Sequence, residues 1–560
     1  MSFQRLIGSR KGVFLLLGSL VLLAGALRLP GLDLKPLHSD EGVNGWFTLR
    51  LYWWDVYRYR PSDYHGPFLY YVNLFFFRLL GPSEVSLRLG TALAGALAPL
   101  ALIPLSRYLG WVGLACVGLL LSVSPTMVYF ARTNIHETWL VLGSILWAAG
   151  LLRYCARPQM KWALLASGGA ALSFTNKETA LITGASLLFG LGLAWLAGDR
   201  QASGNRLGDP ELFSGATRLE ALASWFRGRS RPLLAGVVFF IGFVVLFFSS
   251  MLTWFSGLIG FFEAFGLWIG HGVTGRNQAK DWNYFLELLL VCDGVLLLAA
   301  ASCAGLWSVV TRHRSGLFFF GWTISALLFY SAIPYKTPWC VLSIELPLLL
   351  SCGWLVQQLT LVVRNTLLSG FWRCTALLAL SSLFLVAVPL SAESLEANRH
   401  SFDDDDHPYV FVQTERGYYE LLQDLFGVGD QIQVVEGRSP AVVNIDPKNP
   451  TRWYTITRGW TYRKSDYLNG KLPTVKQLKA AEIVLCTGRS SRSVGQMLVD
   501  EGGSWHRELY ELRPGVRVSA WFRSRWWDTY QRAGGRTSSV WPRPAHREIR
   551  RPPLPRRYRK

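Results

Sequence analysis

Charged residues are scarce in this sequence, and acidic residues are scarcer than basic ones. Asp, Glu, Lys and Arg make up 17% of the 560 residues, and 57 Lys and Arg against 37 Asp and Glu leave a formal net charge of +20. A soluble globular protein carries roughly 25% charged residues, so this composition argues against one. A hydrophobic content of 51% also excludes a disordered or collagen-like chain.

The excess of basic residues does not indicate a nucleic-acid partner. Much of it lies in short loops beside apolar runs and near the C-terminus, which is typical of membrane topology combined with a basic tail. The eight cysteines lack the spacing of a disulfide framework or a zinc site, since no CxxC pair occurs. They are interpreted as small packing residues.

Long apolar runs are abundant and predict a polytopic α-helical membrane protein. The first run, residues 12–27, follows basic residues and has no small-residue cleavage site after it, so it is predicted to be an uncleaved span with its N-terminus inside. Further runs near the ~20 residues that a crossing helix needs cover 86–106, 111–130, 138–154, 162–176, 179–197, 233–256, 284–310, 316–333, 340–363 and 371–391.

The aromatic run Gly66–Leu80 decides the predicted topology. If it does not span, the basic loops all lie inside, as the positive-inside rule prefers; if it spans, they all move outside. These loops lie around residues 107, 153–161, 199–232, 312–314 and 364–373. Gly66–Leu80 is therefore predicted to be an interfacial helix. About eleven spans then remain in a cell (inner) membrane, with a cytoplasmic N-terminus and an extracytoplasmic C-terminal domain.

Three regions are predicted along the chain: a transmembrane domain over residues 1–392, an extracytoplasmic α/β domain over 400–530, and a disordered Pro- and Arg-rich tail over 534–560. In the middle region, strand-like stretches occur at Tyr409–Gln413, Ile432–Val435, Ala441–Ile445, Ile483–Cys486 and Val516–Trp521. Helix-like stretches alternate with them at Arg416–Phe426, Thr474–Ala480 and Ser493–Val499.

Charged residues gather in the loops that this topology places outside. Asp40 and Glu41 directly follow the first span, and two adjacent carboxylates there are costly unless they are solvated, paired or used. One alternative is helix capping, with Ser39 or Asp40 as N-cap of a helix that carries Trp46–Tyr59. Capping alone would account for one of the two acids.

Three short outer loops, 132–137, 175–179 and 334–339, each contain a cation. A charge at the end of one span can simply reach water, but three such loops on one face predict a shared polar cavity lined by carboxylates and by Arg132, Lys177 and Lys336. Inside apolar runs, Glu287, Asp293 and Glu345 should pair or face the bundle interior, and Asp293 could mark an ion pathway.

Such a cavity suits transfer of a sugar from a lipid phosphate. The phosphate leaves as an anion, so it needs positive charge and no proton, while the acceptor hydroxyl needs one carboxylate as general base. A glycosidase would instead use two carboxylates in acid and base roles. The sequence does not determine whether a metal is needed: His38, Asp40, Glu41, His65 and Glu137 could hold a divalent cation if their loops converge.

In their order along the chain, these motifs resemble the GT-C superfamily of membrane glycosyltransferases, which use polyprenyl-phosphate-linked sugars at the outer face. The sequence is most similar to the branch of protein O-mannosyltransferases and aminoarabinose transferases, and closer still to a prokaryotic family named flippase-associated membrane proteins. The resemblance covers roughly residues 12–360 and rests on His38–Gly42, Tyr64–Pro67, Leu69–Tyr71, Arg132–Glu137, Lys177–Thr179 and Tyr335–Trp339.

The resemblance implies a set of site residues. The superfamily's catalytic Asp falls on Asp40, whereas its second acid falls near Asn134 and Glu137, which leaves open which residue fills that role. The catalytic candidates are thus Asp40, Glu41 and Glu137, and the substrate-binding candidates are His65, Arg132, Lys177, Glu178, Tyr335 and Lys336.

The predicted activity is an inverting glycosyl transfer with Asp40 as base, from a polyprenyl-phosphate sugar donor to a glycan, lipid or protein acceptor, among membrane lipids. A lipid-linked sugar flippase or transporter component, and a non-catalytic scaffold of a glycan-assembly system, are the alternatives. In either of these, the same cations would hold a lipid phosphate without chemistry.

Overall fold

A computed structural model describes the chain apart from residues 1–9, 63–64, 198–229, 276–277, 366–369, 405, 412–413, 446–449, 461–466, 469, 489 and 537–560. Most of the basic 199–232 loop and of the predicted tail therefore lies outside the described residues. Contacts divide the chain into two compact units. The membrane unit comprises Met1–Pro30, Val56–Val72 and Arg88–His400, and the α/β unit comprises Gly31–Asp55, Asn73–Leu87 and Ser401–Lys560.

Helices occupy the apolar runs of the membrane unit. They are α2 (Arg10–Arg28), α5 (Glu84–Ala101, which starts in the other unit), η1 (Ile103–Leu105), α6 (Ser106–Val123), α7 (Pro125–Ala131), α8 (Glu137–Ala156), α9 (Met160–Asn176), α10 (Ala180–Leu196), α12 (Ser230–Phe248), α13 (Ser256–Thr274), α14 (Tyr284–Cys292), α15 (Gly294–Thr311), α16 (Arg314–Ala332), η3 (Pro338–Val341), α17 (Leu342–Arg364), α18 (Gly370–Leu385) and α19 (Ala387–Arg399). The predicted helical membrane fold is confirmed.

Eight helical segments of the described chain are long and apolar enough to cross a membrane. The predicted number of eleven spans is not confirmed. One of the eight, Glu84–Val123, has 40 residues and would extend about 60 Å if straight, roughly twice the ~30 Å of a hydrocarbon core. Gly110, with a φ of 61°, interrupts it. This single segment therefore contains two of the predicted spans.

The ambiguous aromatic run forms a short helix, α4 (Phe68–Leu80), of 13 residues. Its length is about 20 Å, which is too short to cross a ~30 Å core by itself. This length agrees with the prediction that the run does not span.

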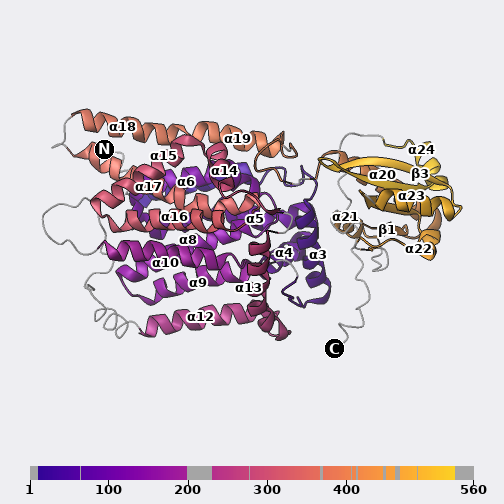
Figure 1. The fold of residues 1–560 in the computed structure, drawn as a ribbon, viewed down its shortest axis with the longest axis horizontal. Coiled ribbons are helices and arrows are strands. Elements are labelled where there is room, and N and C mark those ends of the chain that lie inside the picture. Colours follow the sequence, from indigo (N-terminus) through magenta and orange to yellow (C-terminus); the bar gives the residue numbers. More distant parts are fainter. Residues whose placement is uncertain are drawn as a thin grey trace. The chain divides into compact units, whose positions relative to one another are not determined.

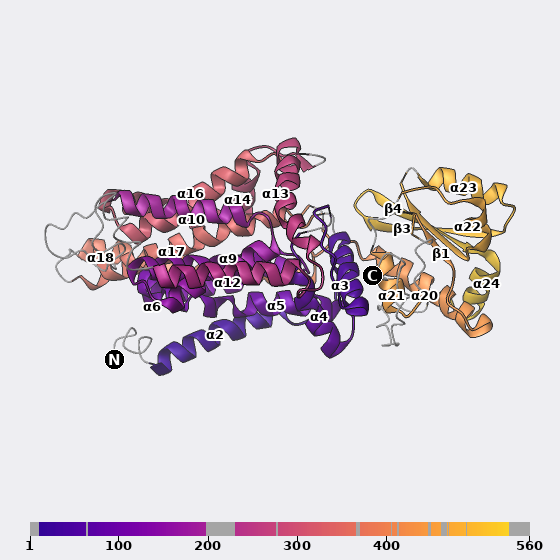
Figure 2. The same ribbon diagram turned by 90° about the horizontal axis from the view of Figure 1, so that it is seen from below.

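Helices of the membrane unit lie side by side (Figures 1 and 2), and small residues allow them to approach closely. A Cβ added to Gly150 of α8 would lie 2.2 Å from the backbone nitrogen of Ala166 in α9, and one on Gly113 of α6 would lie 2.3 Å from the carbonyl oxygen of Gly353 in α17. Because lipid tails are as apolar as the side chains, such close packing supplies much of the attraction between membrane helices.

A four-stranded sheet forms the centre of the α/β unit, in the order β1 (Val442–Asn444), β2 (Ile483–Thr487), β4 (Val516–Arg523) and β3 (Trp505–Arg513). β1 and β2 are parallel, and the other two pairs are antiparallel. Around the sheet lie α3 (Ser39–Trp54), α20 (Gly417–Glu436), α21 (Thr451–Thr457), α22 (Val475–Ala480), α23 (Ser490–Asp500) and α24 (Ser524–Arg532).

Alternating strand residues give this sheet two buried faces. One face packs with α3, α20, α21 and α24 around Leu485, Ala520 and Trp453, and the other packs with α22 and α23 around Val484 and Cys486. The helix that carries Asp40 is therefore part of the α/β unit, although it lies more than 300 residues upstream of the sheet in the sequence.

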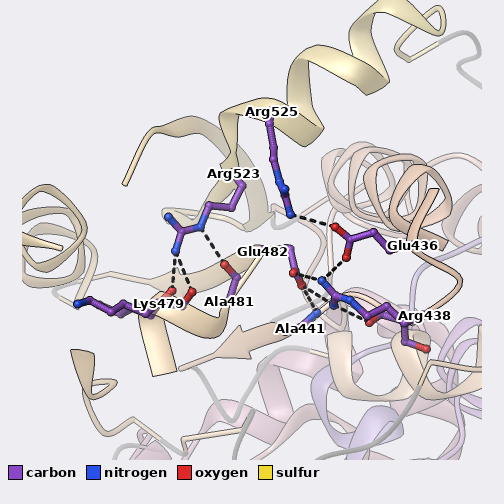
Figure 3. Close-up of polar contacts among 10 residues, drawn as sticks. Glu436, Arg438, Ala441, Lys479, Ala481, Glu482, Arg523 and Arg525 are labelled. Carbon is purple, nitrogen blue, oxygen red and sulfur yellow. Dashed lines mark hydrogen bonds and ion pairs between the residues drawn. The ribbon is translucent and has the colours of Figure 1, made fainter. Parts of the chain in front are cut away.

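Charged side chains form hydrogen bonds and ion pairs around the start of the parallel strands β1 and β2 (Figure 3). Glu482, just before β2, accepts hydrogen bonds from Arg438 at 2.5 Å and from the backbone nitrogen of Ala441 at 2.6 Å. Arg523 at the end of β4 donates to the carbonyl oxygens of Ala481 and Lys479. These contacts fix the turn into β2, and they are interpreted as structural.

Two strand predictions in this unit are wrong. Ile432–Val435 belongs to helix α20, because Leu421, Leu425, Val428 and Ile432 are buried at helical spacing. Tyr409–Phe411 forms no strand, and the rest of that stretch lies outside the described residues. Strand β3 was not predicted, since its alternating pattern is carried by charged residues.

The orientation of the membrane unit can be tested by labelling. Single cysteines placed near Lys177 and Lys336 should react with an impermeant reagent added from outside, and cysteines in the 199–232 loop should not. The background must lack the exposed native thiols Cys303 and Cys374. Labelling of the 199–232 loop from outside would reverse the topology.

Candidate active site

The segment that carries Asp40 begins with a histidine cap. His38 is the N-cap of α3: its Nδ1 accepts a hydrogen bond from the backbone nitrogen of Asp40 at 3.2 Å, and Glu41 Oε2 accepts one from the backbone nitrogen of His38 at 3.0 Å. The prediction that Ser39 or Asp40 is the N-cap is therefore wrong. Burial lowers the pKa of His38, which favours the neutral imidazole that this bond requires.

Glu41 and Asp40 consequently differ in their surroundings. Glu41 is fully buried and completes the capping box, an arrangement that satisfies otherwise unpaired amides at a helix start. The side chain of Asp40 is 23% exposed, with an oxygen 3.9 Å from His38 Nδ1. Capping therefore accounts for Glu41, whereas the carboxylate of Asp40 is not part of the capping box.

In the membrane unit, His65 and Glu178 form a close pair. His65 Nδ1 lies 2.6 Å from Glu178 Oε2, with the two side chains 15% and 9% exposed. The His65 ring stacks on Trp268 of α13 at 4.6 Å and meets the His136 ring edge-on at 5.0 Å. A carboxylate on one ring nitrogen fixes the orientation and tautomer of an imidazole.

Gly66 permits this arrangement by bringing two loops into contact. Its backbone nitrogen donates to the carbonyl oxygen of Asn176 at 3.1 Å, and an added Cβ would lie 2.2 Å from the carbonyl oxygen of Thr175. Only a residue without a side chain fits this approach. The predicted neighbours Asp63 and Tyr64 lie outside the described residues.

Helix α13, which supplies Trp268, runs across the direction of α9 and α10 (Figure 1). The turn before it contains Ser250, Met251 and Leu252 with φ values of 52°, 53° and 67°, a left-handed conformation that costs roughly 1–2 kcal/mol per residue. Ser250 Oγ accepts from the backbone nitrogen of Tyr57 at 2.8 Å and lies 2.9 Å from the Tyr71 hydroxyl. These hydrogen bonds stabilise the turn, and the turn in turn fixes where α13 begins.

Glu137 and Lys177 form a second, more deeply buried pair. Their side chains make an ion pair and are each 4% exposed. Burial alone would lower the pKa of Lys177, but Glu137 outweighs it and the pKa is raised. His136, the N-cap of α8, has its pKa lowered well below the ordinary value by burial and, to a smaller extent, by His65 and Lys177.

This ion pair makes a testable contribution to stability. Lys177→Met should leave Glu137 buried without its cation and destabilise the protein by about 3–5 kcal/mol. Thermal unfolding of the purified protein in detergent measures the loss. The double variant Lys177→Met/Glu137→Gln should recover most of it, and equal losses in the single and double variants would contradict the pairing.

Arg132 and Lys336 lie against backbone carbonyls. Arg132 Nη1 donates to the carbonyl oxygens of Arg28 at 2.9 Å and Pro30 at 2.7 Å, at the end of α2. Lys336 Nζ donates to the carbonyl oxygens of Ile333 at 2.5 Å and Lys280 at 3.3 Å. Among the described residues no carboxylate lies within salt-bridge distance of Lys336, and burial lowers its pKa, against a smaller raising effect of Asp281. Its ammonium is thus desolvated without a directly paired anion.

The loop of Lys336 is held by a short backbone pairing with the segment after α13. Tyr335 forms an isolated antiparallel bridge with Ala279, and the backbone nitrogen of Lys336 donates to the carbonyl oxygen of Gln278 at 3.0 Å.

The structure therefore brings His65, Glu178, Glu137 and Lys177 together in the membrane unit and places Asp40 and Glu41 in the α/β unit. His136 and Trp268 join the first group, although sequence reasoning did not assign them. His136 stands in the motif beside Glu137, so its position was a usable signal, whereas nothing in the sequence marks Trp268.

A metal centre is not evident in the described part of the chain. No group of three or more His, Cys, Asp or Glu side chains there is placed to hold a metal ion. The five residues considered for a divalent cation divide between the two units, with His38, Asp40 and Glu41 in one and His65 and Glu137 in the other.

We compared the chain with protein-family models, curated proteins and solved structures. Residues 64–207 match the sequence model of the dolichyl-phosphate-mannose-protein mannosyltransferase family. No curated protein matches the chain. The crystal structure of ArnT from Cupriavidus metallidurans bound to undecaprenyl phosphate is similar with a TM-score of 0.53 and 17% identity, over 91% of this chain and 98% of that one.

The structure of the same ArnT in the apo state gives a TM-score of 0.55 and 16% identity, over 91% of this chain and 97% of that one. Identity this low establishes the fold and not the substrate. The likeness extends along nearly the whole chain, and the family match falls on the segment that contains His65, Glu137 and Lys177. The chain therefore shares the fold of this ArnT along most of its length, and its residues 64–207 resemble the mannosyltransferase family.

Proposed function

We propose that this protein is a glycosyltransferase that moves a sugar from a polyprenyl-phosphate-linked donor to an acceptor at the outer face of the cell (inner) membrane. The observation that carries the proposal is the likeness of fold, over 91% of the chain, to a protein crystallised with undecaprenyl phosphate. The buried polar side chains at the helix ends of the membrane unit support it, because charges within a membrane protein are retained chiefly where they have a function.

The leaving phosphate would be held by cations of the membrane unit. Lys336 is the leading candidate, because its desolvated ammonium contacts carbonyl oxygens and no carboxylate among the described residues. Lys177 is neutralised by Glu137, and Arg132 donates to the end of α2, so their contributions would be weaker. Because Nδ1 of His65 is bound to Glu178, His65 would contact the donor through Nε2. Tyr335 would contribute to the site from the loop that carries Lys336.

The acceptor would be activated by Asp40. In a single inverting displacement, the acceptor oxygen forms a bond to the anomeric carbon, the bond from that carbon to the phosphate oxygen breaks, and the acceptor proton moves to the Asp40 carboxylate. Polyprenyl phosphate leaves as an anion stabilised by the cations. Glu41 would support Asp40 through the capping box, and Glu137 is the second candidate base. No step requires a metal ion.

Transfer by purified protein tests the proposal directly. The protein in lipid nanodiscs is incubated with radiolabelled polyprenyl-phosphate sugars and with glycan, lipid and protein acceptors, and labelled product is separated from the donor. Donor-dependent product is expected. Donor binding with movement of the labelled lipid between leaflets and no product would identify a flippase component, and neither activity would favour a scaffold.

A further inference from the structure

Two acidic residues of the membrane unit meet at a break between helices. Asp293 separates α14 from α15, where Gly294 has a φ of 79°, and Glu345 lies in the first turn of α17. The side chains are 1% and 0% exposed. Neither residue belongs to the candidate active site, and the proposed transfer step gives them no role.

The hydrogen bonds of this acid pair are incomplete. Glu345 accepts hydrogen bonds from the hydroxyls of Ser124 and Thr126 at the start of α7. Neither oxygen of Asp293 receives a hydrogen bond from any donor in the described chain. The group that the Asp293 carboxyl contacts is the carboxyl of Glu345. Because two ionised carboxylates offer only acceptors, this contact can be a hydrogen bond only if one of them carries a proton.

The surrounding charge also favours a bound proton. Arg28 at the end of α2 interacts electrostatically with Glu345, and its guanidinium donates to the carbonyl oxygens of Leu121 and Ser122 at 2.7 Å. Two ionised acids would carry one more negative charge than Arg28 alone compensates, and such an excess in a low-dielectric interior is strongly unfavourable.

The other ionisable side chains around the pair do not change this balance. They include the thiols of Cys292 in α14 and Cys352 in α17, which both interact with Asp293, and Glu393 of α19 interacts in turn with Cys292. A second cation, Arg132, interacts with Arg28, but its guanidinium donates to the backbone carbonyl oxygens of Arg28 and Pro30.

We propose that Asp293 and Glu345 form a proton-binding site within the membrane unit, in which one proton is shared between the two carboxyl groups. The bound proton makes the Asp293 hydrogen bond, cancels the extra charge, and allows α14, α15 and α17 to pack at the helix break. The site is distinct from the proposed transfer chemistry and does not depend on it.

Replacing Asp293 with Asn provides a sharp test, because Asn resembles a protonated Asp and its amide can still donate to Glu345. Infrared difference spectra at neutral pH should contain a band of a protonated carboxyl in the wild-type protein that is absent from Asp293→Asn. The thermal midpoint of the variant should stay within a few degrees of wild type. Unfolding of the wild type releases the shared proton, so its unfolding equilibrium constant should rise with pH between neutral and alkaline conditions. This rise should be steeper than that of Asp293→Asn by up to a factor of ten per pH unit.

A matched control and a second variant complete the experiment. Glu287→Gln replaces an acid of α14 that is hydrogen-bonded to Asn283 at an exposed position, and it should leave the band and the pH dependence unchanged. If Asp293→Asn fails to fold, Glu345→Gln should remove the same band. A wild-type protein without this band, or a band that persists in both acid variants, overturns the proposal. A thermal midpoint that depends on sodium, with that dependence lost in Asp293→Asn, overturns it in favour of a metal cation.

Discussion

Replacing Asp40 with Asn should lower the rate of sugar transfer by roughly 10²–10⁴, the range typical of losing a general base. Asn keeps the shape of Asp but cannot accept the acceptor proton. The protein should still insert, fold and bind donor lipid, because the N-cap of α3 is His38 and the second half of its capping box is Glu41. Turnover and donor binding are measured separately in nanodiscs.

Two other variants make this result interpretable. Glu41→Gln should have a milder effect, since Gln can complete a capping box as Glu does. Asp55→Asn makes the same chemical change at an acid whose side chain is 69% exposed and paired with Arg78, and it should leave transfer unchanged. Near-native transfer by Asp40→Asn would refute the assignment and make Glu137 the next candidate base.

Replacing Lys336 with Ala should lower turnover by at least ~100-fold. Losing one preorganised positive charge from a poorly solvated site should cost roughly 2–4 kcal/mol of transition-state stabilisation, and each factor of ten corresponds to about 1.4 kcal/mol. The expected loss is in turnover and in affinity for the donor phosphate, measured with radiolabelled donor and with polyprenyl phosphate as competitor.

Lys280→Ala is the matched control for this variant. Lys280 lies in the segment that pairs with the Lys336 loop, and its ammonium lies over the Tyr284 ring at 4.1 Å. Its backbone carbonyl oxygen accepts the hydrogen bond from Lys336, and that oxygen survives the substitution, so the effect should be small. Unchanged turnover and donor affinity in Lys336→Ala would mean that this lysine merely reaches the membrane surface.

Several features were predictable because they depend on composition and local order. Apolar runs of spanning length predicted the membrane helices, since backbone groups in lipid must be satisfied within a helix. The predicted resemblance to the GT-C superfamily agrees with the likeness of fold to ArnT and with the family match of residues 64–207, and its finer assignment to flippase-associated proteins stays a prediction. The aromatic run Gly66–Leu80 was predicted to be an interfacial helix; it contains the 13-residue helix α4 (Phe68–Leu80), and its position at the membrane surface stays a prediction.

Other features depend on contacts between residues far apart in the sequence. Ile432–Val435 has β-branched residues typical of a strand, yet burial of the preceding helical face extends α20 through it. The helix of Asp40 packs with the distant sheet, because Leu49, Trp53 and Trp54 complete an apolar core that the C-terminal region alone does not close. No local pattern encodes that association.

The same distinction applies to the candidate site. The sequence alone determined which residue types gather at the ends of the membrane helices, because each motif is local. Only the tertiary structure decided their partners: His65 with Glu178, Lys177 with Glu137, and Asp293 with Glu345. The partner of a buried charge depends on which side chains the packed helices bring within hydrogen-bond distance, and sequence spacing does not contain that information.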